Sequence, residues 1–89
     1  MFEIYLSNAA LKALNTLDKR IVENAKKALL ALKISPLPIK EYDIKKVEGV
    51  DDIYRLRISR YRIVYRIDWS KKEINIIKID KRDEKTYRL

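Results

Sequence analysis

Five arginines crowd the stretch IYRLRISRYRIVYRID, which runs from Ile53 to Asp68. A guanidinium stays charged at every physiological pH, and its planar fork makes bidentate hydrogen bonds to phosphate. Such a cluster could bind a phosphodiester backbone and stabilise negative charge that develops on its oxygens during a reaction. The five residues are Arg55, Arg57, Arg60, Arg62 and Arg66.

The apolar residues in this stretch alternate with the arginines, which is the pattern of two β-strands. If Ser59 and Arg60 form a hairpin loop, Ile58 faces Tyr61 and Arg57 stands opposite Arg62. Like charges in such a position destabilise a sheet by up to about 1 kcal/mol. The pattern therefore favours an anion-binding surface over ordinary solvent-facing arginines, although arginine stems also cover apolar surface well. One face would carry Tyr54, Leu56, Ile58, Tyr61, Ile63, Tyr65 and Ile67, and the other Ile53, Arg55, Arg57, Arg62, Val64 and Arg66.

The net positive charge is concentrated in the same half of the chain. The 89 residues carry a formal charge of +8, and residues 53–89 alone hold 12 basic and 5 acidic side chains. This excess indicates nucleic acid, an anionic membrane surface or an acidic protein as the partner. The membrane is the weakest of these, because the basic residues are expected on strands and not on an amphipathic helix.

The residue types that are missing exclude several kinds of site. The chain has no Cys and no His, so we expect no disulfide and no transition-metal site. We also expect no small-molecule cofactor. The N-terminal segment MFEIYLSNAALKAL lacks the basic start and long apolar run of a signal peptide, and no apolar segment approaches the length of a membrane span. We therefore expect a cytoplasmic protein without membrane contact.

A short strand and two antiparallel helices are expected before the hairpin. Apolar and polar residues alternate over residues 2–6, as in a half-buried strand. Ser7 or Asn8 can cap a first helix and Asp18 a second, and apolar residues recur in both at the helical period. The second helix should end at Ser35, because prolines follow it.

The order of the elements predicts the fold. Residues 37–49 are expected to be irregular, and after the hairpin a third strand, KEINIIKID, runs from Lys72 to Asp80. A strand, two helices and three consecutive strands indicate one small α+β domain over residues 1–89. Its sheet should be mostly antiparallel, with a three-strand meander at its end and both helices on one face.

Further signature residues flank the hairpin: Val47-Glu-Gly49 precedes it, Lys81-Arg82-Asp83 follows one strand later, and Tyr87 lies near the C-terminus. Together they resemble the RelE toxins of the RelE/ParE superfamily, and the similarity covers nearly the whole chain. The resemblance implies a toxin of a type II toxin–antitoxin system: an endoribonuclease, or mRNA interferase, that cleaves messenger RNA in the ribosomal A site without a metal. Such a toxin would inhibit translation. Its partners would be messenger RNA, the ribosome with its ribosomal RNA, and a RelB-like antitoxin that blocks the basic face.

The resemblance also implies roles for single residues. The family's active-site cations match Arg55, Arg57, Arg62 and Arg82, and its C-terminal tyrosine matches Tyr87. If a ribose 2′-hydroxyl attacks the adjacent phosphate, Arg62 and Arg82 suit stabilisation of the transition-state charge, and the other two arginines could grip the phosphate or flanking backbone. Tyr87 could stack on a base or assist a proton transfer.

Other residues complete the predicted site. A guanidinium is a poor general base, so Lys81 or Glu48 is the remaining candidate for proton abstraction. Arg60 stands where many relatives have a glycine, so the turn must differ or tolerate strain. Cations expected to contact RNA are Arg55, Arg57, Arg60, Arg66, Lys78, Lys81 and Lys85.

Two other functions fit the same residues. The arginine face could belong to a non-catalytic module that binds RNA or an acidic protein. A ParE-like inhibitor of gyrase is the other alternative, and the cations at all four matched positions speak against it.

Overall fold

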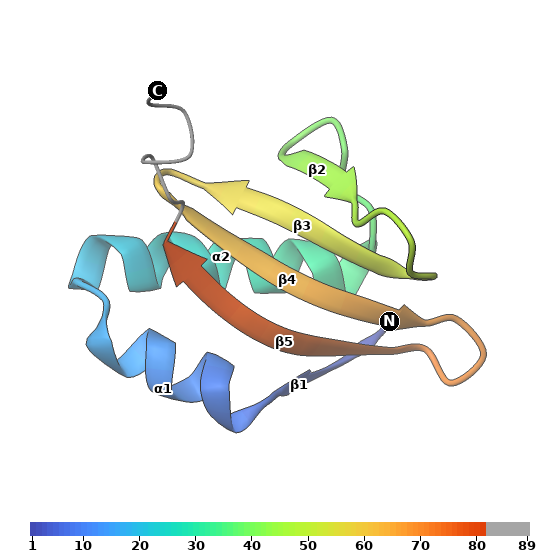
Figure 1. The fold of residues 1–89 in the computed structure, drawn as a ribbon, viewed down its shortest axis with the longest axis horizontal. Coiled ribbons are helices and arrows are strands. Elements are labelled where there is room, and N and C mark those ends of the chain that lie inside the picture. Colours follow the sequence, from blue (N-terminus) through green and yellow to red (C-terminus); the bar gives the residue numbers. More distant parts are fainter. Residues whose placement is uncertain (82–89) are drawn as a thin grey trace.

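The chain folds into two helices and five strands over residues 1–81, the part that the structure describes. Figure 1 shows these elements in the computed structural model. The helices are α1 (Asn8–Thr16) and α2 (Lys19–Ile34), and the strands are β1 (Glu3–Leu6), β2 (Asp43–Lys46), β3 (Ile53–Ile58), β4 (Tyr61–Asp68) and β5 (Glu73–Lys81).

All five strands form one sheet in the order β1-β5-β4-β3-β2. β1 pairs with β5 in parallel, and every other neighbouring pair is antiparallel. The last strand of the described chain therefore lies between the first strand and the hairpin (Figure 1). The predicted α+β fold, its mostly antiparallel sheet and its final meander are confirmed.

The segment expected to be irregular contains the edge strand β2, so that prediction was wrong for residues 43–46. β2 pairs with β3, and its Ile44 lies opposite the buried Leu56. The strand has four residues, DIKK, with a single apolar side chain. Periodicity cannot reveal so short a strand, which forms because β3 offers an unpaired edge.

Both helices begin where the sequence predicts. Ser7 Oγ accepts a hydrogen bond from the Ala10 N–H at 3.0 Å, and Asp18 Oδ1 accepts one from the Ile21 N–H at 3.0 Å. These caps satisfy N–H groups that the first helical turn leaves unpaired. Within residues 1–81, neither helix is long and apolar enough to cross a membrane.

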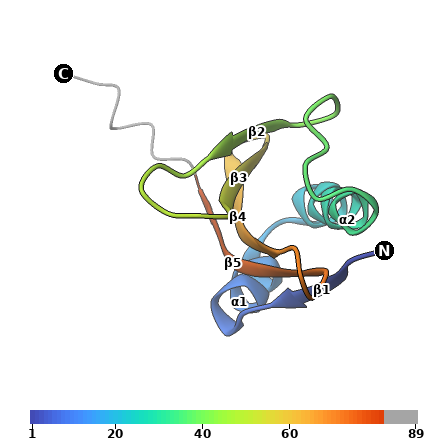
Figure 2. The ribbon, with the colours of Figure 1, turned by 90° about the vertical axis from the view of Figure 1, so that its right-hand side faces the viewer.

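The core lies between the sheet and the helices, which occupy the same side of it (Figure 2). α2 contributes the buried residues Ile21, Ala25, Ala28 and Leu32, spaced on one helical face. The predicted apolar face of the hairpin is also confirmed: Leu56, Ile58, Ile63, Tyr65 and Ile67 are buried there, and Tyr54 and Tyr61 pack at its margin.

Tyr65 joins the centre of the sheet to the end of α2. Its hydroxyl donates a buried hydrogen bond of 2.8 Å to the Pro36 carbonyl. Burial, together with the neighbouring Tyr54, raises the pKa of the Tyr65 hydroxyl. The folded structure therefore favours the protonated form of the Tyr65 hydroxyl.

Candidate nucleic-acid interface

The hairpin has the register that the sequence predicts. Ile58 pairs with Tyr61, and Arg57 pairs with Arg62, which places the two arginine Cα atoms about 5 Å apart. The turn between the strands differs from a glycine turn in a specific way. Ser59, with φ 52°, takes the left-handed conformation, and Arg60 does not, so Ser59 bears the backbone strain.

The face of the sheet turned away from the helices, hereafter the open face, carries the arginines in rows that run across the strands. One row contains two cations between two carboxylates, and the next contains three cations and a valine. The first row is Asp43, Arg57, Arg62 and Asp80, and the second is Lys45, Arg55, Val64 and Lys78, on β2, β3, β4 and β5.

Asp80 holds two cations of the open face. Its Oδ1 lies 3.4 Å from Arg62 Nε, and its Oδ2 lies 3.4 Å from Lys78 Nζ. Arg62 Nε and Asp80 Oδ1 are shielded from solvent and make no hydrogen bond among the described residues. Their contact is therefore an ion pair, which compensates the loss of hydration by charge attraction alone.

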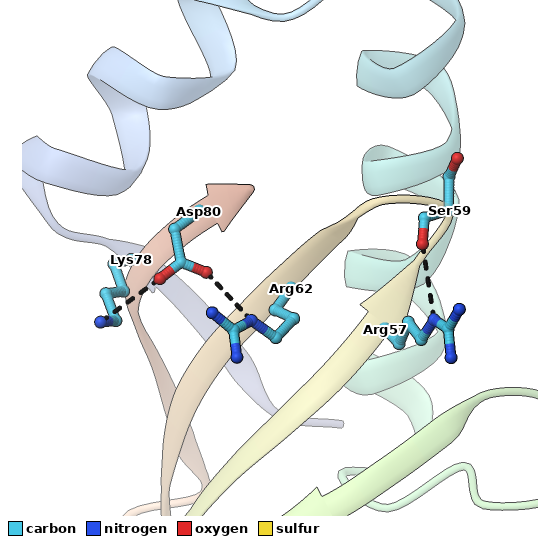
Figure 3. A network of polar contacts seen from close by, with 5 residues as sticks. All are labelled: Arg57, Ser59, Arg62, Lys78 and Asp80. Carbon is cyan, nitrogen blue, oxygen red and sulfur yellow. Dashed lines mark hydrogen bonds and ion pairs between the residues drawn. The ribbon is translucent and has the colours of Figure 1, made fainter. Parts of the chain in front are cut away.

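Arg57 is directed differently from Arg62. Its Nε donates a long hydrogen bond of 3.5 Å to the Ser59 carbonyl. Figure 3 shows the Arg57 guanidinium beside the turn and the Arg62 guanidinium beside Asp80, so the two groups point away from each other. Their backbones are adjacent, but their side chains do not form a ready-made phosphate clamp.

The opposite end of the open face is acidic. Asp68 pairs with Glu73, which also pairs with Glu3 of β1. Hydrogen bonds from the Lys71 N–H and the Ser70 hydroxyl to Asp68 lower the pKa of its carboxyl. The positive charge therefore gathers near the hairpin turn and not over the whole sheet. Among residues 1–81, no three acidic side chains gather to hold a metal ion.

The structure brings together some of the predicted site residues and separates others. Arg55, Arg57, Arg62, Arg66 and Lys78 share the open face. Arg60 lies in the exposed hairpin turn, and Lys81 pairs with Tyr61, whose side chain faces the helices. Glu48 lies between β2 and β3, at the end of β3 far from Arg57. Arg82, Lys85 and Tyr87 lie outside the described residues.

Sequence reasoning missed Asp80, and a β-bulge explains why. Ile74 and Ile76 face the core, so strict alternation would also turn Lys78 and Asp80 toward the helices. Ile77 has no partner on β4, because Val64 pairs with Lys78 and Tyr65 with Ile76. This extra residue reverses the alternation and brings Lys78 and Asp80 onto the open face. Ile76 and Ile77 are both β-branched and apolar, so the sequence carries no signal of where the alternation reverses.

Comparison with known proteins identifies the family. Residues 4–86 match the family model described as the ParE toxin of the type II toxin–antitoxin system parDE. The chain belongs to the RelE/ParE family of toxins. It is also 33% identical over 82 residues to a Methanocaldococcus jannaschii protein named as the toxin RelE1, an alignment that covers 92% of this chain and 91% of that protein.

Solved structures confirm that the fold of this family member is RelE-like. The Pyrococcus horikoshii RelE, solved as a RelE–RelB complex, superposes with a TM-score of 0.85 at 29% identity, covering 93% of this chain and 97% of that one. The isolated Escherichia coli RelE toxin gives a TM-score of 0.80 at 27% identity, with 98% and 92% covered. The predicted family and fold are both confirmed.

Proposed function

We propose that this RelE-family toxin is an endoribonuclease that cleaves messenger RNA in the A site of the ribosome. The observation that carries the proposal is the open face, on which Arg57 and Arg62 occupy opposed positions of a rigid hairpin with Arg55 and Lys78 in the adjoining row. These four long side chains start from adjacent positions of a stiff sheet, an arrangement that suits a phosphodiester group together with its flanking backbone.

The proposed reaction needs no group beyond RNA and protein side chains. The ribose 2′-oxygen forms a bond to the adjacent phosphorus, and the bond from phosphorus to the 5′-oxygen of the next nucleotide breaks. A base takes the 2′-hydroxyl proton, and an acid supplies a proton to the leaving oxygen. Arg62 and Arg82 stabilise charge on the phosphorane oxygens, Arg55 and Arg57 hold the backbone, and Tyr87 stacks on a base or moves a proton.

The charge of +8 supports docking to ribosomal RNA in the cytoplasm. Each phosphate that a lysine or arginine neutralises releases counterions, so binding strengthens with the number of contacts. Arg60 in the turn and Arg66 in the next row extend the cationic surface beyond the proposed cleavage site. Lys81 and Lys85 belong to the same proposal.

Cleavage on translating ribosomes tests the proposal. We expect wild-type protein to cut ribosome-bound message and to arrest growth, and Arg62→Ala with Arg82→Ala to abolish cleavage while the protein still folds and docks. Lys12→Ala with Lys26→Ala, an equal loss of two charges on the exposed surfaces of α1 and α2, should cleave as wild type. Tight RNA binding without any cleavage would instead favour a non-catalytic RNA-binding module.

A RelB-like antitoxin is the proposed inhibitor. Two relatives, from Pyrococcus horikoshii and Escherichia coli, were solved in complex with RelB. An antitoxin that covers the open face should bind in a salt-sensitive manner while retaining an apolar contribution. Charge reversal by Arg55→Glu and Arg57→Glu should weaken the complex, and unchanged affinity would contradict this arrangement.

Inhibition of gyrase is the second candidate, because the matching family model is that of the ParE toxin. The two candidates differ in a direct assay of purified gyrase. A ribosome-dependent nuclease should leave DNA supercoiling unchanged, whereas a ParE-like toxin should block supercoiling and leave message on ribosomes intact.

A further inference from the structure

A hollow of about 270 Å³ opens beside the hairpin turn, at the margin of the open face. Segments distant in the sequence meet around it: the exposed side of α2, the chain before β2, and the end of β3 with its turn. They bring two cations, an amide, a serine and an aromatic ring to one place. The lining residues are Asn24, Lys27, Tyr42, Arg57, Ile58 and Ser59.

Arg57 links this hollow to the proposed cleavage site. Its Cα pairs with that of Arg62 on the open face, yet its guanidinium lies beside the Ser59 carbonyl at the wall of the hollow. Figure 3 shows this direction, away from Arg62 and toward the turn in front of α2. A phosphate held by Arg57 would therefore lie between the hollow and the arginine row.

We propose that the hollow binds the base and ribose of one single-stranded RNA nucleotide next to the phosphate that Arg57 contacts. This inference rests on the proposed function and adds a subsite that selects RNA sequence. Tyr42 is half-buried and packs against the core, so its ring is held in place for stacking. The Asn24 amide carries both donors and an acceptor for a base edge, and Lys27 supplies a second cation for phosphate.

The residue types favour a nucleotide over an acidic protein segment. Carboxylates of such a segment would need only Arg57 and Lys27. An aromatic ring together with an amide is the usual means by which proteins bind unstacked RNA bases. The volume of about 270 Å³ is just below the range of small-molecule pockets, roughly 300 to 1,000 Å³, and fits one nucleotide and not a helix.

Binding of an uncleavable oligonucleotide tests the subsite. The probes are fluorescent, single-stranded 2′-O-methyl RNA octamers that differ in one central base. Tyr42→Leu should weaken binding about five- to 150-fold through the loss of stacking, whereas Tyr42→Phe, which keeps the ring, should bind as wild type. Asn24→Ala should reduce the difference between probes, and Lys27→Ala should weaken all of them and lower the salt dependence by about one phosphate.

The neighbouring Lys26 supplies the matched control, because it is exposed on α2 and does not line the hollow. Lys26→Ala removes the same charge and should bind within about twofold of wild type. Asn24 and Lys27 are themselves exposed, so their variants should unfold at the wild-type temperature, which a thermal melt verifies.

The outcomes separate this inference from the function on which it rests. If Arg57→Ala weakens binding and all the hollow variants bind as wild type, the subsite is overturned and the proposed nuclease stands. If the hollow variants lose antitoxin affinity and keep RNA affinity, the hollow serves a protein partner and the subsite is again overturned. Wild-type protein that neither binds the probes nor cuts ribosome-bound message overturns both proposals.

Discussion

The carboxylate of Asp80 lies inside the proposed RNA-binding surface, so its removal should tighten RNA binding. Asp80→Asn keeps the size of the side chain, removes its charge and raises the net charge from +8 to +9. In the wild type, Arg62 Nε and Lys78 Nζ each lie 3.4 Å from this carboxylate. The substitution frees both cations for phosphate and removes a repulsive charge from beside it.

The size of the effect follows from the distances. A phosphate on the outer side of the Arg62 guanidinium would lie roughly 7 Å from the carboxylate, where repulsion is about 0.6 to 2.4 kcal/mol at effective dielectric constants of 80 to 20. The Arg62 and Asp80 side chains are 31% and 34% exposed, so solvent and salt place the effect toward the lower end. We expect three- to tenfold tighter binding, about 0.6 to 1.4 kcal/mol.

Fluorescence anisotropy with a single-stranded 2′-O-methyl RNA octamer at 0.15 M salt measures this change. Asp51→Asn is the control, because it makes the same charge change in the exposed β2–β3 turn, at the other end of β3. It should alter affinity by less than twofold. Asp80→Asn should also cost less than about 1 kcal/mol of unfolding free energy, as partly exposed ion pairs do. Unchanged or weaker RNA binding by Asp80→Asn would refute the assignment of Arg62 and Lys78 to phosphate.

Three further predictions concern the fold that positions this surface. Tyr65→Phe leaves the Pro36 carbonyl unpaired and should cost about 1 to 3 kcal/mol in chemical denaturation. Because the pKa of Tyr65 is raised in the folded state, wild-type stability should fall above pH 10 by up to about 1.4 kcal/mol per pH unit. In Tyr65→Phe this contribution to the pH dependence of stability should be absent. Leu32→Ala removes a fully buried α2 side chain and should cost about 2 to 5 kcal/mol of unfolding free energy. Leu30→Ala at an exposed position should cost about 0.5 kcal/mol or less, as surface substitutions usually do. The pKa of Asp68 is lowered by its hydrogen bonds, so wild-type stability should fall as the pH drops below about 4. Asp68→Asn should lose less stability over this pH range. Equal losses in the two proteins would contradict a stabilising role for the ionised Asp68 carboxyl.

The sequence was most informative where local rules decide the structure. A two-residue loop and strict alternation fix the register of the hairpin, so the pairing of Arg57 with Arg62 was predictable. The helix starts were equally predictable, because Ser7 and Asp18 satisfy N–H groups a few residues away.

Features set by distant contacts could not be predicted in the same way. β2 exists through its pairing with β3, and the bulge at Ile77 is set by the fit of β5 against β4. The strand β2 and the bulge in β5 together determine which charged side chains lie beside the arginines on the open face. The ion pair of Asp80 with Arg62 depends on that bulge, and the hollow depends on three separate segments meeting at the hairpin turn. The composition of the open face was thus predictable in its arginines and not in its carboxylates.

The interior position of β5, between β1 and β4, has a consequence for the order in which the protein folds. Residues 73–81 follow the other four strands in the sequence, yet they fill the gap between β1 and β4 and bring Ile74, Ile76 and Ile79 into the core. A nascent chain cannot close its sheet before these residues leave the exit tunnel, because β1 and the hairpin have no direct pairing with each other. Such long-range pairing also slows folding. The cationic rows of the open face are therefore complete only after β5 has been made and has paired with both of its neighbours.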